Sequence, residues 1–127
     1  EPITLADFQA AGDIQPGDHV IMWQGREDQY RTSTSHQRPY VTEEAAAWLL
    51  EDRKVRLLGT DSSGFEVRGV AGHPNHTRWF AHDAAVLECL RNLGAIHNQR
   101  FYLVALPLPV QGLDACPVRA IAIEDDV

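Results

Sequence analysis

Short apolar runs alternate with polar turns along this sequence, and their spacing predicts brief helices mixed with brief strands. Segments with a mixed and often capped pattern predict helices at residues 4–11, 42–53 and 76–85. Compact, mostly apolar segments predict strands at residues 19–24, 54–60, 85–90, 100–109 and 117–123. Residues 65–72 are typical of either a partial strand or a bent loop. Helices and strands interleaved in this way indicate an α/β fold.

The first two predicted helices have signals at their ends. Thr4 with Asp7 three residues later is a capping-box pattern, and Gly12 stops the helix that this pattern opens. Thr42 caps the second helix. Two glutamates in its first turn and Arg53 at its end both suit the helix dipole.

The apolar positions also predict where the core lies. Ala46, Leu49 and Leu50 recur at helical spacing and form a stripe that is typical of core packing. Residues 100–109 are apolar without clean alternation, which predicts a strand buried on both faces. Together with the final strand at residues 117–123, this segment predicts a hairpin or a close pair.

Two polar segments lie where a site is expected. Residues 25–38 form a long loop, and long loops often cover a site. Tyr30, His36 and Tyr40 lie in or beside it, either as surface residues or as residues that reach a pocket. The turn at residues 61–64 follows a strand, at the end where α/β folds tend to bind ligands.

Composition narrows the function classes. The chain has 127 residues, which predicts a single domain over residues 1–127 with a real core. Its net charge of −7 argues against nucleic acid or an anionic membrane as a partner. No apolar run approaches the roughly 20 residues that span a bilayer, and Cys89 and Cys116 do not make a disulfide framework, so we expect a cytoplasmic protein. Residues 124–127 are expected to be a solvated acidic tail.

Candidate chemistry concentrates in residues 73–93, around His76 and Glu88. On one straight helix, their twelve-residue separation would place them roughly 18 Å apart along the axis. If the helix stops near Ala84 and Ala85 and the chain returns as a strand, both side chains can point into one pocket. Imidazole and carboxylate are a usual ligand pair for Zn²⁺ or Mn²⁺, so this geometry permits a metal site.

Other interpretations of the same residues stay open. Glu88 lies in an apolar strand and needs a partner, which a metal, Arg119 or a backbone donor would each supply. His73, or His82 with Asp83, could pair instead. The sequence contains no HExxH, CxxC, GxGxxG, GxxxxGK[ST] or GxSxG motif, which leaves serine-hydrolase and nucleotide-binding chemistry without support.

Several segments resemble the cyclase family of metal-dependent hydrolases, which includes bacterial kynurenine formamidase and isatin hydrolase. ITLADFQAAGDIQPGDHVIMWQG is similar to the family's capped helix and PGD-x-V strand, and PYVTEEAAAWLLEDRKVRLLGTDSSG to its next helix, strand and turn. HTRWFAHDAAVLECLRNL and RFYLVALPLPVQGLDACPVRAIAI are similar to its histidine segment and its ending. The similarity is collinear over nearly the whole chain and corresponds to the family's C-terminal half.

The resemblance implies a fold and a site. The fold is the C-terminal half of a swivelling β/β/α domain, with a mixed sheet and two or three short helices. His76 and Glu88 match the family's last two metal ligands at the same spacing, which implies Mn²⁺ or Zn²⁺. The ion would activate water toward a small amide, lactam or ester. Cys116 stands where the family usually has serine.

The family's other ligands and its catalytic histidine come from an N-terminal HxGTHxDxPxH cluster that residues 1–127 do not contain. Catalytic zinc needs about three protein ligands plus water. We therefore expect either an enzyme part completed by an N-terminal half chain or a homo-oligomer partner, or a non-catalytic half-fold that binds a small molecule or supports assembly. In both cases we expect the chain not to be a monomer, because a half-fold exposes apolar faces and sheet edges.

Overall fold

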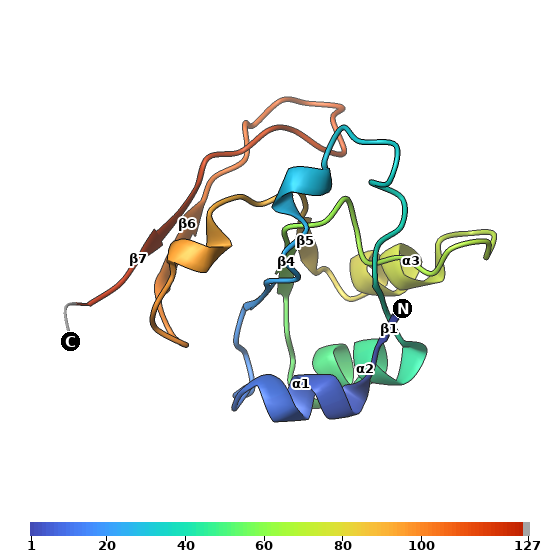
Figure 1. Ribbon diagram of the computed structural model, residues 1–127, viewed down its shortest axis with the longest axis horizontal. Helices are drawn as coiled ribbons and strands as arrows, with labels where there is room; N and C mark the ends of the chain where they lie inside the picture. Colours follow the sequence, from blue (N-terminus) through green and yellow to red (C-terminus); the bar gives the residue numbers. More distant parts are fainter. Residues whose placement is uncertain (126–127) are drawn as a thin grey trace. The chain divides into compact units, whose positions relative to one another are not determined.

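The computed structural model describes residues 1–125, and the chain divides into two compact units, Glu1–Leu93 and Gly94–Val127 (Figure 1). The first unit holds three α-helices and five strands, and the second holds a strand pair. Helices and parallel strands together confirm the α/β class. The single domain expected from the chain length stays a prediction.

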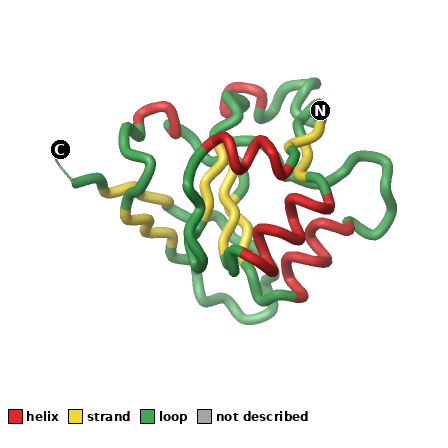
Figure 2. The backbone as a smooth tube through the Cα atoms, turned by 90° about the horizontal axis from the view of Figure 1, so that it is seen from below, coloured by secondary structure: helices red, strands yellow, loops and turns green. Residues whose placement is uncertain are grey.

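A three-stranded parallel sheet is the framework of the first unit. β2 (Val20–Met22), β4 (Leu57–Thr60) and β5 (Ala85–Leu87) are paired in the order β2-β4-β5. Figure 2 shows strands lying side by side at the centre of the first unit. Each falls inside a predicted strand and is shorter than predicted. Because the strands are parallel, the segments that follow them meet at one edge of the sheet, and Asp61 and Glu88 both follow a strand directly.

Local capping chemistry fixes the first two helices as predicted. α1 (Leu5–Ala11) begins with a complete capping box, in which the Asp7 carboxylate accepts from the Thr4 amide at 2.7 Å. α2 (Glu43–Ala47) begins at Thr42, whose hydroxyl accepts from the Ala45 amide at 3.3 Å. The helix then widens into a single π turn over Trp48–Asp52.

The core of the first unit lies between these helices and the sheet. The predicted stripe of Ala46, Leu49 and Leu50 is confirmed, since all three are fully buried. The other fully buried apolar side chains come from several elements: Val41, Ala45, Val55, Leu58, Phe65 and Trp79. This core holds the carboxyl edge of the sheet in place.

One strand pair was not predicted from the sequence. β1 (Pro2–Ile3) pairs in parallel with β3 (Tyr40–Val41), so Tyr40 belongs to a strand. Residues 25–38 form the predicted loop, with one 3₁₀ turn at Glu27–Gln29. The buried Asp61 carboxylate anchors the start of this loop by accepting from the Gln24 and Arg26 amides at 3.0 and 2.6 Å.

The second unit contains the predicted hairpin. β6 (Tyr102–Ala105) and β7 (Ala120–Ile123) pair antiparallel, with Tyr102 opposite Ile123. Among the described residues the two strands pair only with each other, so the mixed sheet implied by the family resemblance is divided into separate sheets. The prediction that residues 100–109 are buried on both faces is wrong, because Tyr102, Leu106 and Leu108 are 70%, 75% and 61% exposed.

Two further predictions concern the C-terminal end and the cysteines. Glu124 is not a purely solvated residue, because its carboxylate accepts from the amides of His97 and Asn98 at 2.8 and 2.5 Å. Residues 126–127 of the predicted tail lie outside the described residues.

Cys89 and Cys116 are free and half-buried. Over residues 1–125, none of the helices has the length and apolar character that crossing a membrane would need.

Candidate metal centre

The structure brings His76 and Glu88 together. α3 (Pro74–Ala81) places His76 in its first turn, and the chain then reverses through Asp83, which has a φ of 52°. β5 follows, and Glu88 is the residue directly after it. Nε2 of His76 lies 3.3 Å from Oε1 of Glu88. The predicted helix, turn and strand are therefore present, although the helix ends a few residues earlier than expected.

A second carboxylate, which the sequence did not reveal, lies behind the imidazole. Glu66 is 4% exposed, and its Oε2 lies 2.8 Å from Nδ1 of His76. Its oxygens also accept from the backbone amides of Val67, Asn75 and His76 at 3.0–3.1 Å. Residues 65–72 therefore form the bent loop rather than a strand, and this loop carries an acid to the N-terminus of α3, where the helix dipole favours negative charge. The sequence carries no signal for Glu66, because this residue lies eight positions before α3 begins and reaches the helix only through the fold of the loop.

The surroundings of His76 and Glu66 shift the pKa of each group. The hydrogen bond to Glu88 raises the pKa of His76, burial opposes this, and the hydrogen bond to Glu66 adds to the increase. Burial on its own would raise the pKa of Glu66. The hydrogen bonds from the His76 backbone and ring, from Asn75 and from Val67 nevertheless hold that pKa below its ordinary value. Both shifts favour the charged forms, so Glu66 is a fixed negative group beside the imidazole.

Aromatic packing restricts the imidazole further. The Phe65 ring lies 4.8 Å from the His76 ring, centroid to centroid, and the Phe80 ring lies 6.0 Å away. Phe65 is itself fixed by an edge-on contact with the buried Trp79 at 5.3 Å. The orientation of His76 is therefore set by side chains from two segments of the first unit.

Gly64 brings the backbone close to Glu88 and Arg38. Gly64 is buried with a φ of +128°, and a Cβ built on it would lie 3.0 Å from Oε1 of Glu88. The same Cβ would lie 3.2 Å from Nη2 of Arg38, whose buried Nε has no hydrogen-bond partner among the described residues. Glycine therefore keeps a gap between an acidic and a basic side chain, which fits a site that receives an ion and an oxygen ligand.

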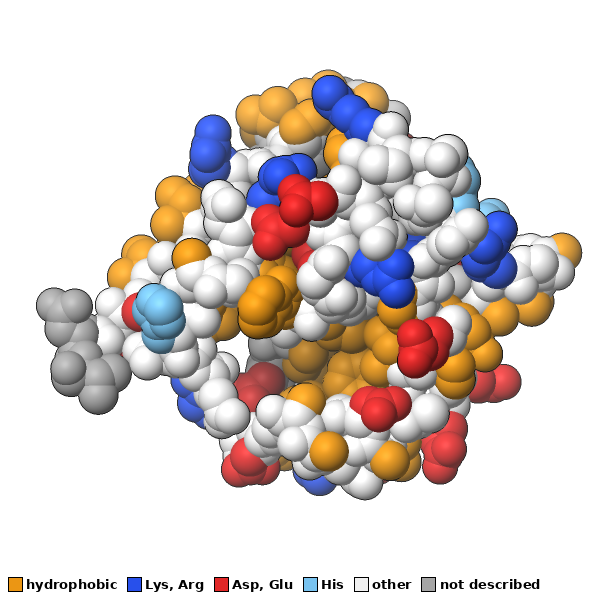
Figure 3. Space-filling view, viewed as in Figure 1, with side chains coloured by type: hydrophobic (Ala, Val, Ile, Leu, Met, Phe, Trp, Pro, Cys, Tyr) orange, Lys and Arg blue, Asp and Glu red, His pale blue; other side chains and the backbone are white. Residues whose placement is uncertain are grey.

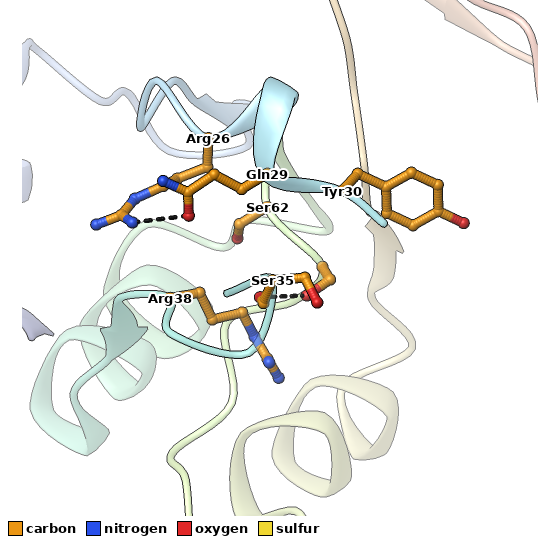
Figure 4. A pocket seen from close by; sticks show the side chains of 7 residues that line it. Arg26, Gln29, Tyr30, Ser35, Arg38 and Ser62 are labelled. Atoms are coloured by element: carbon orange, nitrogen blue, oxygen red, sulfur yellow. Dashed lines mark hydrogen bonds between the residues drawn. The ribbon is translucent and has the colours of Figure 1, made fainter. Parts of the chain in front are cut away.

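Arg38 also lines a small, shallow pocket that opens to solvent (Figure 4). Ser62 and Ser63 line it from the turn after β4, and Tyr30 lines it from the loop, with its ring directed away from Ser62. The other lining side chains also come from the loop: Arg26, Gln29 and Ser35. His36 is exposed and is not among the lining residues.

The other candidate ligands lie apart from the pair. His73 is exposed at the start of α3, with its ring centroid 6.2 Å from that of His76. His82 lies at the other end of the helix, where Nδ1 is 2.9 Å from the Arg78 carbonyl oxygen. Across residues 1–125, no group of three or more His, Cys, Asp or Glu side chains could hold a metal ion. The donor types suit zinc or manganese, but they make up only part of a coordination sphere.

Sequence comparison assigns the chain to a family. The family described as "Putative cyclase" matches residues 1–67, just over half of the chain. The chain belongs to the cyclase family. A kynurenine formamidase from Sphingopyxis alaskensis (strain DSM 13593 / LMG 18877 / RB2256) is 40% identical over 67 residues, which is 53% of this chain and 32% of that protein. His76 and Glu88 lie beyond the stretch that the family match covers.

Solved structures extend the similarity over the remainder. One, described as "Potential Metal-Dependent Hydrolase With Cyclase Activity", is 34% identical with a TM-score of 0.79, covering 95% of this chain and 57% of that one. Isatin hydrolase A from Ralstonia solanacearum shares the fold at 24% identity and a TM-score of 0.82, covering 97% of this chain and 53% of that one. This cyclase-family chain therefore spans about half the length of the structures it matches.

Proposed function

We propose that this chain is part of a metal-dependent hydrolase and contributes His76 and Glu88 to a Zn²⁺ or Mn²⁺ site. An N-terminal half, a partner chain or a second copy would complete the ligand set. The substrate would be a small amide, lactam or ester. The observation that carries the proposal is the 3.3 Å approach of Nε2 of His76 to Oε1 of Glu88. The cytoplasmic location of the protein stays a prediction.

Each side chain has a defined part in this proposal. When bound, a zinc or manganese ion supplies Lewis-acid activation of a carbonyl group and of water. His76 and Glu88 would hold the ion, one through a neutral nitrogen and the other through a carboxylate oxygen. Arg38 places positive charge across the gap at Gly64, where an oxygen of the substrate becomes negative during hydrolysis. The wall of the cavity next to Arg38 carries the hydroxyl groups of Ser62 and Ser63.

The alternative is a non-catalytic module that keeps the half-fold. It is favoured by the lack of a third ligand beside His76 and Glu88 in residues 1–125. The exposed apolar residues of the second unit also suit an assembly role: Tyr102, Leu106, Leu108, Val110, Leu113, Ile121 and Ile123. Figure 3 shows hydrophobic side chains along the hairpin on the face in view.

Metal content and hydrolysis together distinguish these two functions. The native material would be purified, its intact masses determined, and its zinc and manganese measured. We expect a second chain or segment with a histidine and aspartate cluster, about one divalent ion per complete site, and hydrolysis of N-formyl amides, lactams or cyclic imides. A lone 127-residue chain without metal would support the non-catalytic module.

Variants then test the two ligands. His76→Ala and Glu88→Ala should each lower metal occupancy of the complete assembly. His73→Asn is the matched control, because His73 is exposed three residues away and asparagine tolerates its φ of 47°. Metal occupancy that is unchanged in both alanine variants would remove these two residues from the site.

A further inference from the structure

Glu66 uses both carboxylate oxygens at the start of α3. Oε1 accepts from the amides of Val67 and Asn75, each at 3.1 Å, while Oε2 accepts from the His76 amide at 3.0 Å. Oε2 also lies 2.8 Å from Nδ1 of the His76 ring. A carboxylate that is 4% exposed and receives this many donors is held in one position, because any rotation would leave buried donors unpaired.

The backbone donors determine the direction of the bond to the ring. Three amides can only donate, so the carboxylate acts as an acceptor toward all of them, and the positive end of the α3 dipole favours its ionised form. An ionised carboxylate has no proton to give. Nδ1 of His76 must therefore carry the hydrogen of the 2.8 Å contact. Glu88 is a second acceptor, 3.3 Å from Nε2. The neutral ring keeps only one hydrogen, and the shorter contact to the buried Glu66 holds it on Nδ1, because Glu88 is 38% exposed and can turn toward water. The lone pair is then on Nε2.

Nε2 is the nitrogen that faces Glu88, at 3.3 Å. A metal ligand needs its lone pair on the nitrogen that points at the ion, and free imidazole side chains prefer the opposite tautomer, with the hydrogen on Nε2. Packing against Phe65, 4.8 Å away between ring centroids, holds the ring plane but cannot select the tautomer. Among the groups described around His76, Glu66 alone contacts Nδ1.

We infer that Glu66 is a positioning residue of this site: it keeps the hydrogen of His76 on Nδ1 and so presents the Nε2 lone pair to a divalent ion. The inference rests on the proposed function for its metal, but the tautomer is a property of the chain without metal. Partners of this kind typically change metal affinity by about 10–100-fold when they are removed. The family match ends at residue 67, so it covers Glu66 but not His76.

The first test reads the tautomer directly. In the metal-free chain at alkaline pH, where the ring is neutral, long-range ¹H–¹⁵N spectra should show the His76 hydrogen on Nδ1. Glu66→Gln should shift the ring toward the Nε2–H form. A wild-type ring with its hydrogen on Nε2 would overturn the inference, and this result needs no variant to fold.

The second test measures affinity for Zn²⁺ alone, by competition with a chelator, in the complete assembly. Glu66→Gln should weaken binding by about 10–100-fold. Glu43→Gln should leave it unchanged, because Glu43, at the start of α2, pairs with Arg78 of α3 at 2.6 Å and is not a partner of His76. Equal affinity in the wild type and Glu66→Gln would overturn the inference, as would an equal loss in both variants. A wild-type assembly that binds no Zn²⁺ while His76 holds its hydrogen on Nδ1 would instead overturn the proposed function.

Discussion

Replacing Gly64 by alanine tests whether the gap beside Glu88 belongs to the metal site. Two effects are expected. Alanine at a φ of +128° adds backbone strain of about 1–3 kcal/mol, offset by about 0.4–1 kcal/mol because the unfolded chain loses freedom. The new Cβ would also meet Oε1 of Glu88 at 3.0 Å.

The crowding should act on binding rather than on folding. The Glu88 side chain is 38% exposed, so it can rotate away from the new methyl group. Such a rotation would increase its 3.3 Å separation from Nε2 of His76. We expect Zn²⁺ affinity in the complete assembly to fall about tenfold, equivalent to about 1.4 kcal/mol.

Gly69→Ala is the matched control. Gly69 also has a positive φ, +76°, but a Cβ there would meet nothing within 4 Å. Both variants should lose similar stability in urea titrations, whereas only Gly64→Ala should lose affinity in Zn²⁺ competition titrations. If the two alanine variants bind Zn²⁺ as tightly as the wild type does, the gap at Gly64 has no part in the site.

Three further predictions concern stability, pH and assembly. Asn75→Ala should lower the free energy of unfolding by about 1–3 kcal/mol in urea titrations. The reason is that the buried side-chain nitrogen of Asn75 donates to the carbonyl oxygens of Val41 and Phe65 at 2.8 and 3.0 Å. An unchanged midpoint of urea unfolding would contradict these hydrogen bonds. In the metal-free chain, the pKa of His76 in the folded state lies above its ordinary value of 6.5. Protonation of His76 therefore stabilises the folded state fully below pH 6.5, and this stabilisation is lost as the pH rises through the pKa of the folded state. Glu88→Gln should reduce that pH dependence in thermal unfolding, and a curve identical to the wild type would refute the assignment. The exposed apolar hairpin of β6 and β7 predicts association at micromolar concentration, and light scattering that finds a clean 14.2 kDa species would contradict it.

The parts of the fold that local chemistry determines were predictable from the sequence. Thr4 and Thr42 mark the start of their helices in the sequence, because a hydroxyl at the N-cap position accepts a hydrogen bond from a backbone amide of the first turn. The reversal between His76 and Glu88 was also predictable, since a short mixed helix pattern gives way to a compact apolar run within twelve residues. These inferences need no knowledge of what packs against the segments.

The parts that depend on distant packing were not predictable. Glu66 has no motif around it, and it becomes a partner of His76 only when residues 65–72 fold back on α3. The β1–β3 pairing is two residues long, too short for any periodicity to be detected. The burial expected for residues 100–109 assumed a covering layer, and an apolar pattern cannot say whether that layer belongs to the same chain.

The way Glu66 gathers its donors also has a consequence for hydrogen exchange. The amides of Val67, Asn75 and His76 all end on one carboxylate, although they come from a loop and from a helix. Opening that contact releases the three amides in one event, so they should exchange with solvent deuterium at closely similar rates. The same opening frees the His76 ring from Oε2. The exchange rate of these three amides therefore reports how often the centre loosens, in a chain that carries no metal.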